Sequence, residues 1–208
     1  MALYVPPAFA AGDRSLALAL IDEHPFATLV TPAGAEPQVT HLPLLRDGDV
    51  LLGHVARANP HWRSFAEADS LAVFAGPHAY VSPTWYAAPK AAVPTWNFTA
   101  VHVHGRIAVI DDARERADVV DRLVARFEGA GEDAWRFALT GREREAMLGA
   151  IVAFRMPIGR LEAKLKLSQN RGADDRARVA AALARSDDAQ AQATAGWMRR
   201  TGAFDDDR

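Results

Sequence analysis

The clearest sign of the fold is the stretch PQVTHLPLLRDGDVLLGHV, residues 37–55. Two apolar runs, Pro37 to Arg46 and Val50 to Val55, flank the pair Asp47-Gly48, and this dipeptide favours a two-residue hairpin turn. We therefore predict two antiparallel strands here. His41 and His54 each lie six residues from this turn, so we expect them to be near each other across the pair.

Further strands and helices are predicted on both sides of this hairpin. Apolar runs bounded by Gly and Pro predict strands over residues 26–31, 71–75, 79–82, 99–110 and 151–156. Helical spacing predicts helices over residues 13–23, from Asp112 to Gly129, and after Thr140. Strands in a meander with helices between them indicate a mainly β, α+β fold built on an antiparallel barrel.

The C-terminal part of the chain has a different composition. From Asp174 it becomes Ala-rich, with Val179 and Leu183 as its apolar anchors. After Ser186, Trp197 is the one large apolar group. We expect one domain over residues 1–185, followed by a helical or frayed tail over residues 186–208.

Composition excludes several classes of protein. The formal net charge is −2, so no global basic field attracts nucleic acid, and direct DNA binding is doubtful. Cysteine is absent, which excludes disulfides, thiolate metal sites and a cysteine nucleophile. No apolar run approaches the ~20 residues that span a bilayer, and the N-terminus has no secretion-signal pattern. We expect a cytoplasmic protein without a membrane segment.

A phosphate site is predicted where the hairpin's second strand ends. Arg57 lies just before Asn59-Pro60, an N-cap followed by proline at the first position of a short helix. A guanidinium beside helix N-terminal amides is suited to phosphate. The alternative is a surface arginine next to an ordinary capped helix. No glycine-rich loop follows a strand, so neither a P-loop nor a dinucleotide fingerprint is present.

Other polar and aromatic residues leave their roles open. Aromatic residues in the Pro- and Trp-rich segment 83–98 could stack on a flat ring, form a dimer interface or form the core of the loop. His102 and His104 share one strand face, but we find no acidic third ligand nearby and expect no metal site. The residue types of a serine hydrolase are present, but we set this function aside because no Gly-x-Ser-x-Gly elbow exists. The densest polar run extends from Lys164 to Arg171.

Seven short motifs occur in order along the chain. They are YVPPAF (residues 4–9), HPFATL (24–29), THLP (40–43), GHVARANP (53–60), YVSPTWY (80–86), VPTWNF (93–98) and KLKLSQNR (164–171). Their combination resembles the PaiB-type family of FMN-binding negative transcriptional regulators, from the N-terminus to about Leu183. The resemblance implies a split β-barrel related to pyridoxamine-phosphate oxidase, with FMN at the interface of a homodimer.

The resemblance also implies which residues contact the flavin. Those that correspond to phosphate and ribityl contacts are Thr40, His41, His54, Arg57 and Asn59. Those that correspond to contacts with the ring or from the partner subunit are Tyr80, Ser82, Trp85, Trp96, Lys166, Ser168, Gln169 and Asn170. The two lines of reasoning agree at Arg57, where the residues alone already predict an anion.

Four functions are compatible with these residues. The first is a flavin-binding module that lowers gene expression, and the second is a flavin-dependent oxidoreductase whose hydride chemistry comes from the cofactor. The third, a direct DNA-binding repressor, has little support because no recognition helix or basic face is found. The fourth is a haem-binding relative on the same barrel, with histidine as the axial ligand.

Overall fold

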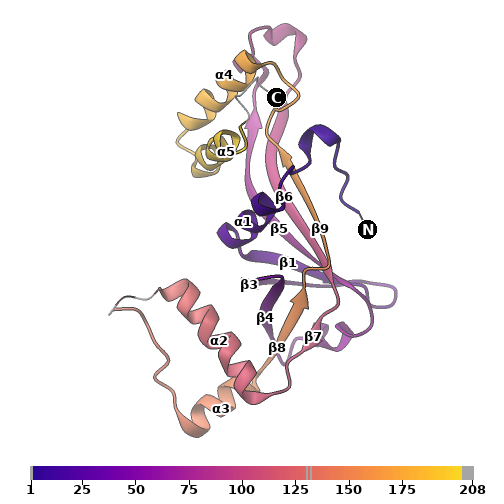
Figure 1. The fold of residues 1–208 in the computed structure, drawn as a ribbon, viewed down its shortest axis with the longest axis vertical. Helices are drawn as coiled ribbons and strands as arrows, with labels where there is room; N and C mark the ends of the chain where they lie inside the picture. The colour runs from indigo at the N-terminus through magenta and orange to yellow at the C-terminus, as the bar shows by residue number, and fades with distance from the viewer. Residues whose placement is uncertain (1, 130, 132, 203–208) are drawn as a thin grey trace. The chain divides into compact units, whose positions relative to one another are not determined.

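A computed structural model describes residues 2–129, 131 and 133–202 (Figure 1). Its strands are β1 (Phe26–Thr31), β2 (Gln38–Pro43), β3 (Leu45–Asp47), β4 (Val50–Ala56), β5 (Ser70–Val81), β6 (Thr95–Gly105), β7 (Ala108–Val109), β8 (Ile151–Pro157) and β9 (Arg160–Lys166). They form a five-stranded sheet of order β2-β1-β5-β6-β9 and a four-stranded sheet of order β3-β4-β8-β7. The pairings of β1 with β2 and β5, and of β4 with β3 and β8, are antiparallel, as predicted.

Helices connect the strands or follow them. The α-helices are α1 (Arg14–Glu23), α2 (Ala113–Glu128), α3 (Gly141–Gly149), α4 (Ala173–Ala184) and α5 (Ala189–Arg200). Short 3-10 helices are η1 (Pro7–Phe9), η2 (Pro60–Ser64), η3 (Pro83–Trp85) and η4 (Pro89–Ala91). By contacts, one compact unit comprises Met1–Glu23, Ala75–Val101 and Glu162–Arg208, and the other comprises His24–Phe74 and His102–Leu161. We call them the first and the second unit.

In the first unit, α1 packs closely against the strands. Its buried residues include Leu20, whose Cδ1 lies 2.9 Å from the position that a Cβ on Gly76 would occupy. The Thr99 Oγ1 atom lies only 2.3 Å from the same position. A side chain larger than hydrogen would therefore collide with both neighbours, and glycine at position 76 permits the close approach.

Residues 189–200 form the helix α5 in the first unit. Asp188 caps α5 by accepting a hydrogen bond from the Gln190 amide, and α5 buries Trp197 and Met198. Figure 1 shows α4 and α5 side by side, and the two helices are in contact. Of the two outcomes predicted for the tail, a helix forms over Ala189–Arg200 because this helix has an apolar face to bury. Residues 203–208 lie outside the described ranges.

In the second unit, α2 covers the four-stranded sheet. Asp112 accepts hydrogen bonds from the amides of Arg114 and Glu115, and the helix ends at Gly129 with φ of 83°, as predicted. The buried core of this unit joins helix residues to β4 and β8. Its members are Leu52, Ile110, Val119, Leu123 and Ala153. Phe127, in the last turn of α2, is 51% exposed and does not belong to this core.

The predicted hairpin is present, but its strands differ from the expectation. β3 pairs with β4 around Gly48, whereas β2 belongs to the other sheet. The chain changes sheets at Leu44, a fully buried residue whose amide donates to the Pro25 carbonyl at 2.9 Å. His41 therefore pairs with Thr28 on β1, and His54 pairs with Ala153 on β8. The expected pairing of His41 with His54 was wrong.

Two other strand predictions were also wrong. β5 continues through Gly76-Pro77, where two shorter strands were expected. The Pro77 carbonyl accepts a hydrogen bond from Thr99 Oγ1 on β6 at 3.3 Å, so proline does not interrupt the association of the strands. The strand expected over 99–110 begins earlier, at Thr95, and is divided between β6 and β7. β9 coincides with part of the polar run that we did not assign to a strand.

Candidate functional site

The residues predicted to contact the FMN phosphate and ribityl chain all lie in the second unit, and two of them share a hydrogen-bond network there. Asn59 Nδ2 donates to Thr40 Oγ1 at 3.0 Å, and Thr40 Oγ1 lies 2.7 Å from His61 Nδ1. The opposite nitrogen of His61 is 2.8 Å from Thr31 Oγ1, which in turn contacts Ser70 Oγ at 2.7 Å. We call Thr40, Asn59, His61, Thr31 and Ser70 the Thr40 network. It holds Thr40 and Asn59 in fixed orientations.

His61 is the centre of this network, and it was not among the predicted residues. Its side chain is 1% exposed, and burial lowers the pKa of its imidazole. A neutral imidazole can donate at one nitrogen and accept at the other, which matches its two hydroxyl partners. The only signal in the sequence was its position, two residues after the predicted N-cap Asn59. In the structure, Asn59 Oδ1 accepts a hydrogen bond from the His61 amide.

His54 contains a buried polar atom that has no partner. In the described ranges, His54 Nδ1 is inaccessible to solvent and makes no hydrogen bond. Burial also lowers the pKa of this imidazole. Buried polar atoms normally have partners, so an unpaired nitrogen is compatible with a ligand atom that completes it.

Arg57 has a structural role that its sequence context did not indicate. Its Nε donates to the Gly149 carbonyl at 2.6 Å and its Nη2 to the Ile151 carbonyl at 2.9 Å. These bonds hold the junction between α3 and β8. The neighbouring helix η2 is a single short 3-10 segment whose His61 amide is already capped by Asn59. The expected pocket of open helix amides beside Arg57 is thus largely occupied by the protein itself.

His41, the last of these predicted residues, lies on β2, and its Nδ1 is 3.0 Å from Thr28 Oγ1.

A second group of predicted residues surrounds a cavity in the first unit. This cavity has a volume of about 190 Å³, and we call it the Lys166 pocket. Its lining residues are Tyr86, Val93, Thr95, Asn97, Lys166, Ser168, Asn170 and Arg171. Three of the predicted contacts, Lys166, Ser168 and Asn170, therefore come together, and five residues outside the predicted set complete the wall.

Asn97 and Ser168 form a buried polar pair in this wall. Asn97 is 1% exposed and Ser168 4% exposed. Asn97 Nδ2 donates to Ser168 Oγ at 3.0 Å, and Ser168 Oγ lies 3.1 Å from Asn97 Oδ1. Ser168 has φ of 69°, in the left-handed region that side chains other than glycine rarely adopt. Such strain persists only where the surroundings maintain it, and it is frequent at ligand sites.

Lys166 contributes a constrained ammonium group. Its Nζ donates to Thr95 Oγ1 and to the Trp96 carbonyl, each at 2.5 Å. Burial lowers the pKa of Lys166, and the nearby charges of Lys164 and Arg171 lower it further. Of these two charges, Arg171 lines the pocket together with Lys166, and a bound anion would relieve the repulsion between them.

The remaining predicted residues of the first unit lie outside the lining of the pocket. Tyr80 and Trp96 form an exposed edge-to-face pair with ring centroids 6.1 Å apart. Ser82 caps η3, and Trp85 is half-buried at its end. Gln169 bonds to the main chain of its own turn, accepting from the Leu167 amide and donating to the Leu165 carbonyl. These bonds stabilise the turn that follows β9.

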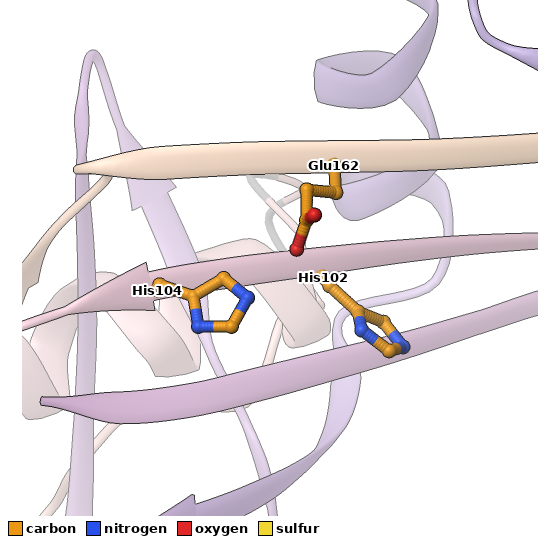
Figure 2. Close-up of side chains that lie close together, drawn as sticks. All are labelled: His102, His104 and Glu162. Atoms are coloured by element: carbon orange, nitrogen blue, oxygen red, sulfur yellow. The ribbon is translucent and has the colours of Figure 1, made fainter. Parts of the chain in front are cut away.

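Two histidines considered as metal ligands lie on β6. Figure 2 shows His102 and His104 projecting from this strand, grouped with Glu162 of β9. Glu162 is the acidic residue that sequence spacing did not reveal. Arg160 Nη2 lies 3.1 Å from His104 Nε2, and a guanidinium can only donate. His104 Nε2 therefore accepts a hydrogen bond from the Arg160 guanidinium, and its lone pair is not free to bind a metal ion. The absence of a metal site stays a prediction.

Comparison with known proteins identifies the chain's relatives. A family model described as "Putative FMN-binding domain" matches residues 3–160. Protease synthase and sporulation protein PAI 2 from Bacillus subtilis is 34% identical over 180 residues, covering 83% of this chain and 85% of that protein.

Solved structures agree on the fold. The flavocytochrome Anf3 from Azotobacter vinelandii superposes with a TM-score of 0.63 at 19% identity, covering 76% of this chain and 69% of that chain. An FAD- and haem-binding protein from Mycobacterium smegmatis gives a TM-score of 0.60 at 22% identity, covering 75% and 72%. The fold is the split β-barrel found among flavin-binding proteins. The chain therefore belongs to this FMN-binding family, and its relationship to the Bacillus subtilis protein agrees with the PaiB-type resemblance of its motifs.

The residues of the second unit suit FMN chemically. Thr40 and Asn59 supply neutral hydrogen-bonding groups, His54 an unpaired buried nitrogen, and Arg57 a permanent positive charge. The neutral groups can bond to the ribityl hydroxyls of FMN, and the cation can bond to its phosphate.

Among the helices that the structure describes, none is long and apolar enough to cross a membrane.

Proposed function

We propose that this chain is a cytoplasmic, homodimeric regulator that lowers gene expression in a manner that depends on bound FMN. Membership of the PaiB-type family supports the cofactor and the direction of regulation. The net charge of −2 supports an indirect effect, without specific DNA contact by this chain. When bound, FMN supplies hydride and electron transfer through its ring.

The Thr40 network is the main support for the proposed site of the flavin's phosphate and ribityl chain. We propose that Thr40, His41, His54, Arg57 and Asn59 contact the phosphate and ribityl chain. Thr40 and Asn59 are oriented in advance by His61, so binding does not have to immobilise them. The unpaired His54 nitrogen gains a partner in the complex. Arg57 keeps its carbonyl bonds and contributes its charge to the phosphate.

A homodimer is proposed because aromatic groups of the first unit lie exposed. Trp96 is 52% exposed and Tyr80 47% exposed, and their rings contact each other edge to face. Exposed aromatic clusters commonly mark a surface that another molecule covers. Tyr80, Ser82, Trp85 and Trp96 are the residues that we propose to cover the flavin ring or the partner subunit.

Flavin titrations test the phosphate assignment. FMN and riboflavin differ only in the phosphate, so each variant is titrated with both by flavin fluorescence. We expect Arg57→Gln to weaken FMN binding by roughly 10- to 100-fold, because a charge-assisted contact contributes about 1.5–3 kcal/mol. Riboflavin binding should change much less. Arg63→Gln is the matched control, since Arg63 is an exposed arginine in η2, the short helix that follows Arg57 in the chain.

Two results would contradict the proposal. Equal FMN affinity in Arg57→Gln and Arg63→Gln removes Arg57 from the phosphate site. Undiminished repression of target transcripts by a variant that retains no FMN removes the flavin from regulation. Oxidation of NAD(P)H that requires bound FMN would instead favour the oxidoreductase, and it is measured on the same preparations.

A further inference from the structure

The Lys166 pocket has the charge of an anion site. Lys166 and Arg171 both line it, and none of its eight lining residues is acidic. Two cations on one small cavity wall repel each other unless an anion lies between them. Burial strengthens both the repulsion and the attraction to such an anion, because water screens charges less in a cavity than at an open surface.

A buried hydroxyl in the same wall has no partner. Tyr86 is 4% exposed, and within the part of the chain that the structure describes its hydroxyl oxygen makes no hydrogen bond. The Arg171 guanidinium carbon lies 4.5 Å from the centroid of the Tyr86 ring, a cation–π contact that fixes both groups. An unpaired buried hydroxyl is unfavourable, so a ligand atom that accepts a hydrogen bond from it is stabilised there.

The other walls of the pocket are already organised. The ammonium of Lys166 has three protons, and its two bonds to Thr95 and the Trp96 carbonyl account for two of them. The Asn97–Ser168 pair is held by reciprocal hydrogen bonds, and it includes the strained Ser168 backbone. A ligand therefore meets donors whose positions the protein has already determined.

We propose that this pocket binds the oxyanion of a small molecule, a phosphate or a carboxylate group, through Lys166, Arg171 and the Tyr86 hydroxyl. The volume of about 190 Å³ is smaller than the 300–1,000 Å³ of sites that hold whole drug-sized ligands. The pocket accordingly takes one charged group and little else. This inference goes beyond the proposed function because it does not require FMN.

The oxyanion has two possible sources with the same chemistry. One is a free anionic metabolite, and the other is the phosphate of a flavin. The experiment therefore uses inorganic phosphate as the probe, on the full chain both without FMN and saturated with FMN. Binding is measured by calorimetry and by phosphorus-31 NMR line broadening, with chloride at matched ionic strength as the reference.

Variants identify the pocket. Tyr86→Phe removes one oxygen and keeps the ring beneath Arg171, so we expect a folded protein whose phosphate affinity is lower by about tenfold. Lys166→Met should reduce it by about 10- to 100-fold. Lys90→Met is the matched control, because Lys90 is an exposed lysine on η4 outside the pocket lining, and it should bind phosphate like the parent.

Each outcome supports or overturns the inference. Phosphate binding that persists in FMN-saturated protein and weakens in Tyr86→Phe supports a free metabolite. Displacement of phosphate by FMN but not by riboflavin, together with weaker FMN binding in Tyr86→Phe, supports the flavin's own phosphate. Identical responses to phosphate and chloride, or equal affinity in Tyr86→Phe and Lys90→Met, overturn the site. FMN binding that depends on Arg57 is measured separately, so either proposal can fail alone.

Discussion

Replacement of His61 by leucine tests whether the Thr40 network is a buried, neutral structure. His61 bonds to Thr40 and Thr31, but neither hydroxyl would be left without a partner. Asn59 remains 3.0 Å from Thr40 Oγ1, and Ser70 remains 2.7 Å from Thr31 Oγ1. The change therefore removes two net hydrogen bonds of about 0.5–1.5 kcal/mol each, without creating an orphan. We expect the free energy of unfolding at pH 8 to fall by about 2 kcal/mol.

The same variant should alter how stability depends on pH. Burial lowers the folded-state pKa of both His61 and His54, whereas in the unfolded chain a histidine titrates near 6.5. As the pH falls through about 6.5, the unfolded chain gains protons that the folded chain does not, so stability is lost. The slope is at most about 1.4 kcal/mol per pH unit for each histidine, or about 2.7 for the two.

Urea unfolding of FMN-free protein at several pH values between 7.5 and 5.5 measures both effects. We expect His61→Leu to show about half of the parent's slope in this range, because only His54 still contributes. His41→Leu is the control, since His41 is exposed, and it should preserve the parent's slope. Equal slopes in His61→Leu and the parent would refute the reasoning, because they would mean that His61 is not kept neutral by burial.

Two further substitutions test the packing of the first unit. Gly76→Ala should lower the free energy of unfolding by about 1–3 kcal/mol in urea titrations, because its Cβ would meet Thr99 and Leu20. Gly12→Ala is the control. A Cβ at position 12 has nothing within 4 Å among the described residues, so this change should alter the free energy of unfolding by less than about 0.5 kcal/mol. Trp197→Ala should lower it by about 3–5 kcal/mol and increase amide exchange throughout α5. The half-exposed Trp135 provides its control, and an equal loss in Trp135→Ala would contradict the buried packing of α5.

Local signals in the sequence were sufficient for some of the elements and for the family. The Asp112 cap and the Gly129 stop bound α2 as predicted, since capping depends on residues within one helical turn. The alternation in β6 placed His102 and His104 on one face, and Val101 and Val103 are buried on the other, because side chains of a strand point alternately to its two faces. The ordered motifs identified an FMN-binding family, and the matching family model confirmed it.

Partners distant in the chain could be assigned only from the tertiary structure. The pattern of residues 37–55 indicated a hairpin, but not that Leu44 carries the chain from one sheet to the other, since a strand's apolar pattern does not name its neighbour. The hydrogen bonds of His61 to Thr40 and Thr31 likewise depend on segments that are distant in the chain. The same is true of the surroundings of Tyr86. Tyr86 meets Arg171, 85 positions later, in one pocket wall.

The sequence of residues 37–55 therefore determined that antiparallel strands form there, because turn chemistry and periodicity act over a few residues. Which sheets those strands join, and which polar atoms remain unpaired beside a cavity, depended on the burial of side chains from segments far apart in the chain. Burial and hydrogen bonding across such distances are properties of the folded molecule, and they have no local pattern in the sequence.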